Sequence, residues 1–321
     1  MMTRVALLDD YQGAAIKSAD WQSLHPQLQI EALPAHIADP EALARRLHAH
    51  ECVVLMRERT AFPKSLIDRL PNLRLIVTAG MRNAAIDVDA ATARGIQVCG
   101  TNMLGHPTAE LTWGLIISLF RNIPQEHAAT KAGNWQLPLL GHGMKGKTLG
   151  ILGLGRLGSQ VAAVGKAFGM ELIAWSQNLT AAKAAEQGAR LVSKEELFAR
   201  SDCVTIHIVL SPRSRGLVGA ADLARMKPTA YLVNTSRGPI VDEGALHEAL
   251  RNRRIAGAAL DVYSVEPLPM DDPMRSLDNV ILTPHLGYAV EEAYTQVYGE
   301  ALEIIQGFLA GKVIRPINEI K

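Results

Sequence analysis

Residues 148–158 read TLGILGLGRLG, and the fold of the whole chain can be worked out from this stretch. A short apolar run leads into Gly153-x-Gly155-x-x-Gly158, and the residues VAAVGKAFG that follow have helical periodicity. A strand, a tight glycine turn and a helix start together open a dinucleotide-binding unit, because free amides at the helix N-terminus favour a pyrophosphate. The pattern predicts a dinucleotide bound beside Gly153, Gly155 and Gly158.

The motif begins near the middle of the 321-residue chain, so the residues before it must form something else, most simply a second domain for a substrate. Apolar strand-like runs alternate with helical stretches throughout, which is typical of a parallel α/β fold. A long amphipathic helix is expected over Glu291–Leu309, and we expect it to return to the first domain. The predicted domains are 1–100 with 288–321, for the substrate, and 101–287, for the dinucleotide.

The composition excludes several classes of function. A formal net charge of +1 argues against a nucleic-acid or membrane-surface partner held by bulk electrostatics. The longest apolar run, Leu111–Phe120, is about half of a membrane span, and the N-terminus lacks the features of a signal peptide. Cys52, Cys99 and Cys203 have no metal-ligand spacing and fit reduced thiols, so no metal is expected and the cytoplasm is the expected location.

The position that normally selects the dinucleotide holds an uncharged residue. An acidic side chain about 20 positions after the glycine turn usually binds the ribose hydroxyls and repels a 2′-phosphate. Here ELIAWSQNLT places Ser176 at that position, and Lys183 is the nearest cation. Either the loop contacts the cofactor through its backbone, or NADP is accepted. The sequence thus predicts NAD or NADP without a choice between them.

Three later segments resemble the signatures of the D-2-hydroxyacid dehydrogenase family. They are NTSRGPIVDE (234–243), ALDVYSVEPL (259–268) and TPHLG (283–287), and together with the glycine turn they stand in the family's order and spacing. The resemblance covers essentially the whole chain. It implies that Arg237, Glu266 and His285 are the catalytic arginine, glutamate and histidine.

These residue types suit the chemistry that the resemblance implies. Reduction of a 2-keto acid needs a hydride from nicotinamide and a proton on the resulting alkoxide oxygen. A histidine can supply that proton near neutral pH, and a neighbouring carboxylate fixes its tautomer. An arginine can hold the substrate carboxylate in a fork. Taken singly, each of the three residues could instead be a cap, a turn residue or a surface charge.

The resemblance also implies which other residues line the cofactor. They are Arg156, Leu157, Ser176, Leu210, Thr235, Ser236, Arg237, Asp261 and His285. Asp261 would bond the nicotinamide carboxamide, although a cap or turn is the alternative. His207 ends a strand beside this pocket, and a noncatalytic histidine whose ring is hydrogen-bonded is the better interpretation.

Two loops of the first domain are candidates for the substrate side. In the family, the loop that contains Ala79, Gly80 and Met81 offers backbone amides to the substrate carboxylate, although Arg82-Asn83 depart from the usual glycine there. Arg57 resembles the arginine of phosphoglycerate-type members and, with Arg82 nearby, could contact a distal phosphate. An exposed, salt-bridged loop is the alternative for Arg57.

The resemblance implies a doubly wound Rossmann cofactor domain, a smaller flavodoxin-like α/β substrate domain and a cleft between them. It further implies a homodimer built on the helix over 108–122, with a small 2-keto or 2-hydroxy acid as substrate. A nucleotide-sensing corepressor on the same fold is the alternative from another class, although corepressors carry long extensions that this sequence lacks. Formate dehydrogenase is a closer alternative, but it should have a different loop before His285.

Overall fold

The computed structural model describes residues 2–320, which fold into two compact units. One unit comprises residues 2–104 with 289–320, and the other comprises Gly105–Tyr288. The chain therefore passes between the units at Leu104–Gly105 and again at Tyr288–Ala289. No helix among the described residues combines the length and the apolarity that crossing a bilayer requires.

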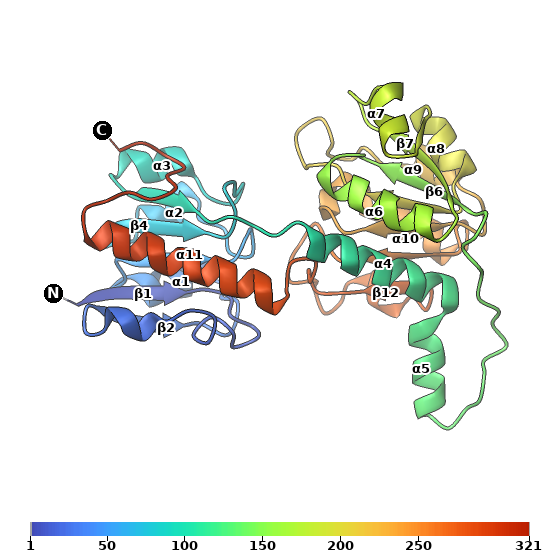
Figure 1. Ribbon diagram of the computed structural model, residues 1–321. Coiled ribbons are helices and arrows are strands. Elements are labelled where there is room, and N and C mark those ends of the chain that lie inside the picture. Colours follow the sequence, from blue (N-terminus) through green and yellow to red (C-terminus); the bar gives the residue numbers. More distant parts are fainter. Residues whose placement is uncertain (1, 321) are drawn as a thin grey trace. The chain divides into compact units, whose positions relative to one another are not determined.

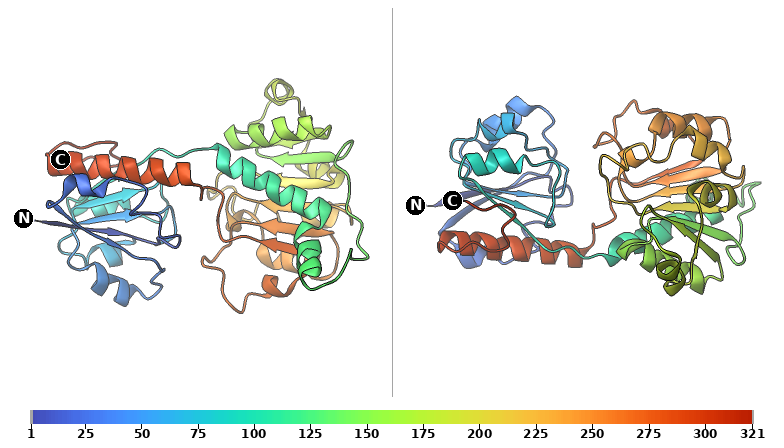
Figure 2. Two further views of the ribbon diagram at one scale, coloured as in Figure 1. Left: turned by 60° about the horizontal axis from the view of Figure 1, so that its bottom comes forward. Right: turned by 90° about the horizontal axis from the view of Figure 1, so that it is seen from above.

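The first unit has a five-stranded parallel sheet in the order β2-β1-β3-β4-β5, which is the flavodoxin-like order. Its strands are β1 (Thr3–Leu7), β2 (Leu28–Ala32), β3 (Cys52–Leu55), β4 (Leu75–Thr78) and β5 (Gln97–Gly100). Its helices are η1 (Trp21–Leu24), α1 (Pro40–Leu47), α2 (Lys64–Ile67), α3 (Val88–Ala93) and α11 (Glu291–Leu309). The sheet lies between α1–α3 on one face and α11 on the other (Figure 2).

The second unit has a seven-stranded parallel sheet in the order β12-β11-β10-β9-β6-β7-β8. Its strands are β6 (Thr148–Leu152), β7 (Glu171–Trp175), β8 (Arg190–Leu191), β9 (Cys203–Ile206), β10 (Tyr231–Asn234), β11 (Gly257–Leu260) and β12 (Val280–Leu282). The order reverses between β6 and β9, as in doubly wound dinucleotide-binding sheets. The predicted fold class is confirmed.

Helices cover both faces of this second sheet (Figures 1 and 2). The helices of the second unit are α4 (His106–Arg121), α5 (Ile123–Lys131), α6 (Arg156–Ala167), α7 (Ala181–Glu186), α8 (Lys194–Arg200), α9 (Ala220–Arg225) and α10 (Glu243–Arg251), with short turns η2 (Gly238–Ile240) and η3 (Pro273–Ser276), and all except α5 bury residues against the rest of the unit. Local signals start several of them. For example, Ser193 and Glu196 form a reciprocal capping box at α8, and Asp242 caps α10.

The apolar stripe of α11 explains why the C-terminal segment belongs to the first unit. Val297, Ala301 and Ile305 are all buried, and the helix packs on β4. Burying one face of an amphipathic helix against a sheet is what stabilises such a helix in a protein. The first unit is thus built from both ends of the chain.

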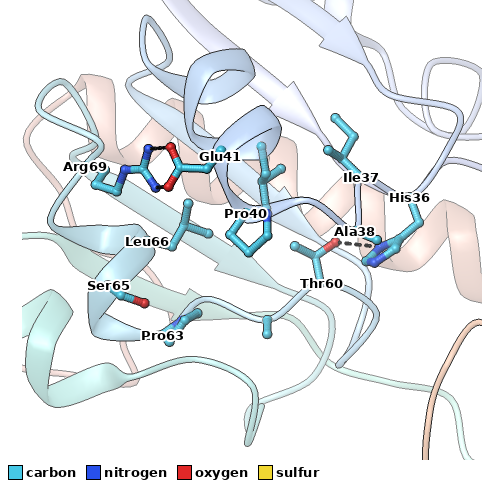
Figure 3. A pocket seen from close by; sticks show the side chains of 12 residues that line it. His36, Ile37, Ala38, Pro40, Glu41, Thr60, Pro63, Ser65, Leu66 and Arg69 are labelled. Carbon is cyan, nitrogen blue, oxygen red and sulfur yellow. Dashed lines mark hydrogen bonds and ion pairs between the residues drawn. The ribbon is translucent and has the colours of Figure 1, made fainter.

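A cavity of about 320 Å³ lies in the first unit between α1 and α2 (Figure 3). His36 and Thr60 line one end of it, and the ion pair of Glu41 with Arg69 lines the other. At the first end, both residues contact the buried Asp9 carboxylate. It accepts a hydrogen bond from Thr60 Oγ1 at 2.6 Å and lies 3.2 Å from His36 Nδ1. None of the residues predicted for the site lines this cavity.

Candidate active site

The glycine turn has the backbone geometry that its sequence predicts. Gly153 has a φ of +102°, and a Cβ there would lie 2.8 Å from the carbonyl carbon of His207. A Cβ on Gly158 would lie 2.1 Å from the oxygen of Gly153. Only glycine fits either position, because a side chain would separate β6, α6 and the end of β9.

Gly155 has a different environment, and this difference indicates where a dinucleotide would fit. A Cβ added to Gly155 would meet no atom within 4 Å, so the space beside its backbone is open. The next residue, Arg156, begins α6, and no side chain caps this helix. Free amides of a helix N-terminus beside an open glycine backbone suit a pyrophosphate. The residues present therefore fit the dinucleotide that the motif predicts.

The other residues predicted for the cofactor lie in loops that follow the carboxyl ends of the strands. Ser176 follows β7, and Leu210 lies in the loop after β9. After β10, the Thr235 hydroxyl lies 2.8 Å from that of Thr112 on α4, and Ser236 Oγ donates to the carbonyl of Ile208 at 2.5 Å. Arg156 and Leu157 occupy the first turn of α6. In open α/β sheets this edge is where ligands bind.

His285 and Glu266 form a direct pair. Nδ1 of His285 lies 2.7 Å from Oε2 of Glu266, and both side chains are mostly buried. The other carboxylate oxygen, Oε1, accepts a hydrogen bond from the Tyr263 N–H at 2.9 Å. His285 has a φ of +55°, a conformation that non-glycine residues adopt at a cost and that often marks functional sites. The contact through Nδ1 leaves Nε2 as the ring nitrogen for chemistry.

Asp261 is fully buried and holds the loop that carries His285. Its Oδ1 accepts hydrogen bonds from Thr283 Oγ1 at 2.6 Å and from the Leu286 N–H at 2.7 Å. Its Oδ2 accepts one from the Gly287 N–H at 2.9 Å. Burial raises the pKa of this carboxyl, and these hydrogen bonds oppose that rise. Asp261 therefore stabilises the loop of residues 283–287, as a capping residue stabilises a helix end.

Arg237 stands at the end of the β10 loop, between the cofactor residues and the short turn η2. Its Nη1 donates to the Ser236 carbonyl at 2.7 Å, and its own carbonyl accepts from Asn234 Nδ2 at 3.0 Å. The guanidinium is partly buried, so it sits in a protein environment rather than on an open surface. Arg237, Glu266 and His285 all follow carboxyl ends of neighbouring strands.

His207 was expected to have its ring nitrogens hydrogen-bonded, and this is correct for one of them only. Nε2 lies 2.9 Å from Thr205 Oγ1, whereas the buried Nδ1 has no hydrogen-bond partner among residues 2–320. Burial lowers the pKa of His207 to about 4, so its imidazole is neutral near pH 7. A neutral ring is a poor proton donor at that pH.

In the first unit, the structure brings the Arg57 loop against the loop at the end of β4. A side chain on Gly80 would collide with the Arg57 guanidinium, and Arg57 Nη1 lies 3.4 Å from the carbonyl of Ala79. Arg57 also lies 3.6 Å from the Glu58 carboxylate, so the predicted alternative of a salt-bridged loop is present as well. Asn83 Nδ2 donates a hydrogen bond to the Arg57 carbonyl oxygen at 2.7 Å.

The amides of this loop are not equally available. The Ala79 N–H donates to the Leu55 carbonyl at 2.9 Å, and the Gly80 N–H donates to Thr101 Oγ1 at 3.2 Å. The N–H groups of Met81 and Arg82 make no hydrogen bond within the part of the chain that the structure describes. Any amide donor for a ligand in this loop therefore lies at its second half.

Several residues of the site were not predicted from the sequence. Tyr263 contacts the loops of the catalytic candidates, and Thr108 Oγ1 on α4 donates to the Gly287 carbonyl at 2.8 Å. Tyr263 stands inside a quoted motif, so its position could have singled it out. Thr108 stands in a helix that was assigned only to a dimer contact, and no local pattern indicates its partner.

An exposed apolar segment follows α4 in the same unit. No residue of α5 is buried, and Figure 1 shows α5 and the loop after it projecting from the rest of the second unit. In this loop the side chain of Trp135 is 83% exposed and that of Leu140 is 94% exposed. Large exposed apolar side chains in one segment mark an interaction surface.

The sequence of this chain is similar to those of known proteins. Residues 113–287 match the model of the NAD binding domain of D-isomer specific 2-hydroxyacid dehydrogenases. A glyoxylate reductase of Aeropyrum pernix is 41% identical over 77% of this chain and 77% of its own. A D-3-phosphoglycerate dehydrogenase of Methanocaldococcus jannaschii is 40% identical over 83% of this chain and 52% of its own. The chain thus spans about half the length of that curated relative.

Solved structures agree in fold over nearly the whole chain. A phosphoglycerate oxidoreductase of Vibrio cholerae superposes with a TM-score of 0.92 at 35% identity, covering 97% of this chain and 100% of its own. A D-lactate dehydrogenase of Escherichia coli superposes with a TM-score of 0.83 at 25% identity, covering 98% and 100%. The similarity therefore includes both units.

Proposed function

Because this chain belongs to the family of D-isomer specific 2-hydroxyacid dehydrogenases, we propose that it interconverts a 2-keto acid and a D-2-hydroxy acid with NAD or NADP. The observation that carries this proposal is the 2.7 Å contact between His285 Nδ1 and Glu266 Oε2 at the carboxyl edge of a dinucleotide-binding sheet. A polarised histidine at that edge is what proton transfer to a substrate oxygen requires.

We assign the proton transfer to His285. A dinucleotide held at the glycine turn would supply the hydride for the carbonyl carbon of the keto acid. His285 gives its Nε2 proton to the carbonyl oxygen, which becomes the hydroxyl of the product, and it takes the proton back in the oxidation direction. Glu266 keeps the ring in one orientation through its contact with Nδ1.

We assign Arg237 to the substrate carboxylate. A guanidinium offers donors in a planar fork that matches a carboxylate, and one Nη1 donor is already oriented by the Ser236 carbonyl. In the first unit, we assign the free amide of Met81 to substrate binding, with Gly80 and Ala79 shaping the loop through their bonds to Thr101 and Leu55. Asp261 supports the cofactor site through the His285 loop.

The assignment is tested by a matrix of 2-keto acids against NADH and NADPH. Glyoxylate, hydroxypyruvate, phosphohydroxypyruvate and a bulkier keto acid form one axis, and the chirality of each product is determined. Because Ser176 carries no charge against a 2′-phosphate, we expect turnover with both dinucleotides. Dinucleotide binding without turnover of any keto acid would support the corepressor alternative instead.

Substitution of Arg57 tests whether this residue contacts a distal anionic group of the substrate. We expect Arg57→Ala to lower kcat/KM for a phosphorylated 2-keto acid about 10- to 100-fold, the loss typical of a hydrogen bond to a charged group, and to affect an unphosphorylated one much less. Arg45→Ala, on the exposed face of α1, is the matched control. An unchanged ratio between the two substrates would refute this function of Arg57.

We further propose a cytoplasmic homodimer. The three free cysteines are buried, and burial raises the pKa of Cys99 to about 11, which suits unreactive thiols in a reducing compartment. We assign the dimer contact to α4 and to the exposed segment with Trp135 and Leu140. Analytical ultracentrifugation should give twice the chain mass of 34.7 kDa, and Leu140→Asp should shift the protein toward the monomer. A monomer for the unsubstituted protein would contradict this proposal.

A further inference from the structure

Tyr263 is the residue at which the loops of Arg237, Glu266 and His285 meet. It lies in the loop after β11, three residues after Leu260, and only 8% of it is exposed. Its ring belongs to the core of the second unit, together with Leu246 and Met274. Its position is therefore fixed by packing, independently of any ligand.

The first contact of Tyr263 is with Glu266. The Tyr263 N–H donates to Oε1 at 2.9 Å, while Oε2 lies 2.7 Å from His285 Nδ1. Both oxygens of the carboxylate are thus occupied, one by Tyr263 and the other by the imidazole. A carboxylate held at both oxygens cannot rotate away from the histidine without losing a charge-assisted hydrogen bond.

The second contact is with the loop that carries His285. The Tyr263 hydroxyl lies 2.9 Å from the Thr283 carbonyl and 3.0 Å from the Leu260 carbonyl, so its one proton is shared between them. The Thr283 carbonyl also accepts the His285 N–H at 3.0 Å. This bond holds the backbone next to His285, whose φ of +55° has to be maintained by its surroundings. Burial raises the pKa of Tyr263, so its hydroxyl stays a donor.

The third contact is with the loop that carries Arg237. A Cβ on Gly238, the residue after Arg237, would lie 2.1 Å from the carbonyl carbon of Tyr263, so the two backbones touch. The next amide, that of Ser264, donates to Glu243 Oε1 on α10 at 2.6 Å. The backbone at Tyr263 and Ser264 therefore packs against the Arg237 loop on one side and is hydrogen-bonded to α10 on another.

We propose that Tyr263 is a positioning residue, which holds Glu266 and His285 in their mutual geometry through its N–H and its hydroxyl. This inference rests on the proposed function of the pair. Tyr263 acts through Glu266 and His285 rather than on the substrate. The hydroxyl contribution can be removed alone, because phenylalanine keeps the ring, the N–H and the contact with Gly238.

Tyr263→Phe is the decisive variant. It should fold, because the Leu260 carbonyl still accepts the Thr283 N–H at 2.9 Å and the Thr283 carbonyl still accepts the His285 N–H. We expect kcat for keto-acid reduction to fall about 3- to 10-fold, as for the loss of one hydrogen bond, with NADH affinity unchanged. The loss should lie in kcat and leave the KM for the keto acid unchanged, because Tyr263 acts through the Glu266–His285 pair and not on the substrate.

Tyr231→Phe is the matched control. Tyr231 is also buried, begins β10 at the opposite end of the sheet, and packs against Phe120. We expect this variant to keep the kcat and the KM of the unsubstituted enzyme. A wild-type kcat for Tyr263→Phe, a lowered melting temperature as its only effect, a loss confined to KM, or equal losses in both variants would overturn the inference. Absence of keto-acid reduction by the unsubstituted protein would overturn the proposed function instead.

Discussion

His285→Ala should lower kcat for reduction of a 2-keto acid by roughly 10²- to 10⁴-fold, the usual contribution of a positioned proton donor. The substitution removes the only ring that the described residues place against Glu266 at hydrogen-bond distance. Dinucleotide affinity should change little, because the glycine turn and α6 are built from other residues. Steady-state kinetics with NADH, together with fluorescence titration of NADH, separates the two effects.

Two further variants define what the loss at His285 means. His48→Ala removes an exposed histidine next to α1 and should leave all kinetic constants unchanged. Glu266→Gln should give a smaller loss than His285→Ala, because the amide oxygen can still accept a hydrogen bond from Nδ1 and orient the ring, although the charge of the carboxylate is lost. Retention of full activity by His285→Ala would remove this residue from the mechanism and leave its left-handed backbone without a functional reason.

Much of the fold could be predicted because its strands are apolar runs with clear ends. The bounds expected for the helix Glu291–Leu309 are those observed. The edge strands β2 and β8 are harder to recognise in the sequence. In β2, polar Gln29 and Glu31 interrupt the apolar residues, and β8 has only two residues. Helix α5 buries no residue, so its sequence lacks the apolar stripe by which a helix is recognised.

The candidate site could be predicted as a set of positions but not as a set of bonds. The glycine spacing predicted a dinucleotide beside Gly153, and the resemblance to the family added Arg237 and His285 to the candidate site. The partners that occupy the Ala79 and Gly80 amides, Leu55 and Thr101, are more than 20 residues away in the chain, so no local pattern reveals them. The same holds for the bonds of Asp261 to the loop of residues 283–287.

The carboxylates of Glu266 and Asp261, which stand in one motif, have different hydrogen-bond partners. Glu266 keeps one oxygen on the imidazole of His285, whereas Asp261 uses both oxygens on backbone and hydroxyl donors of the adjacent loop. Glu266 and Asp261 therefore have different structural roles. Glu266 contacts the imidazole ring, and Asp261 fixes the backbone that presents it.

Arg237→Lys should lower kcat/KM for the keto acid by about 10²- to 10⁴-fold, although the positive charge is retained. A lysine ammonium is a point charge and cannot form the two parallel hydrogen bonds by which a guanidinium grips a carboxylate. Each such bond to a charged group contributes about 1.5 to 3 kcal/mol, and the loss of both sets the expected range. Most of the effect should be in KM, with a further loss in kcat because the carbonyl is less well aligned with His285.

The control for Arg237→Lys is Arg254→Lys, which changes an exposed arginine of the same unit and should leave kcat/KM unchanged. A second measurement uses substrates instead of variants. If Arg237 holds the carboxylate, then an aldehyde or ketone that lacks this group should be reduced equally slowly by the unsubstituted enzyme and by Arg237→Lys. Equal sensitivity of both substrate classes to the substitution would instead mean that Arg237 supports the cofactor or the fold, since the Ser236 N–H and the Arg237 carbonyl also anchor the β10 loop through Asn234.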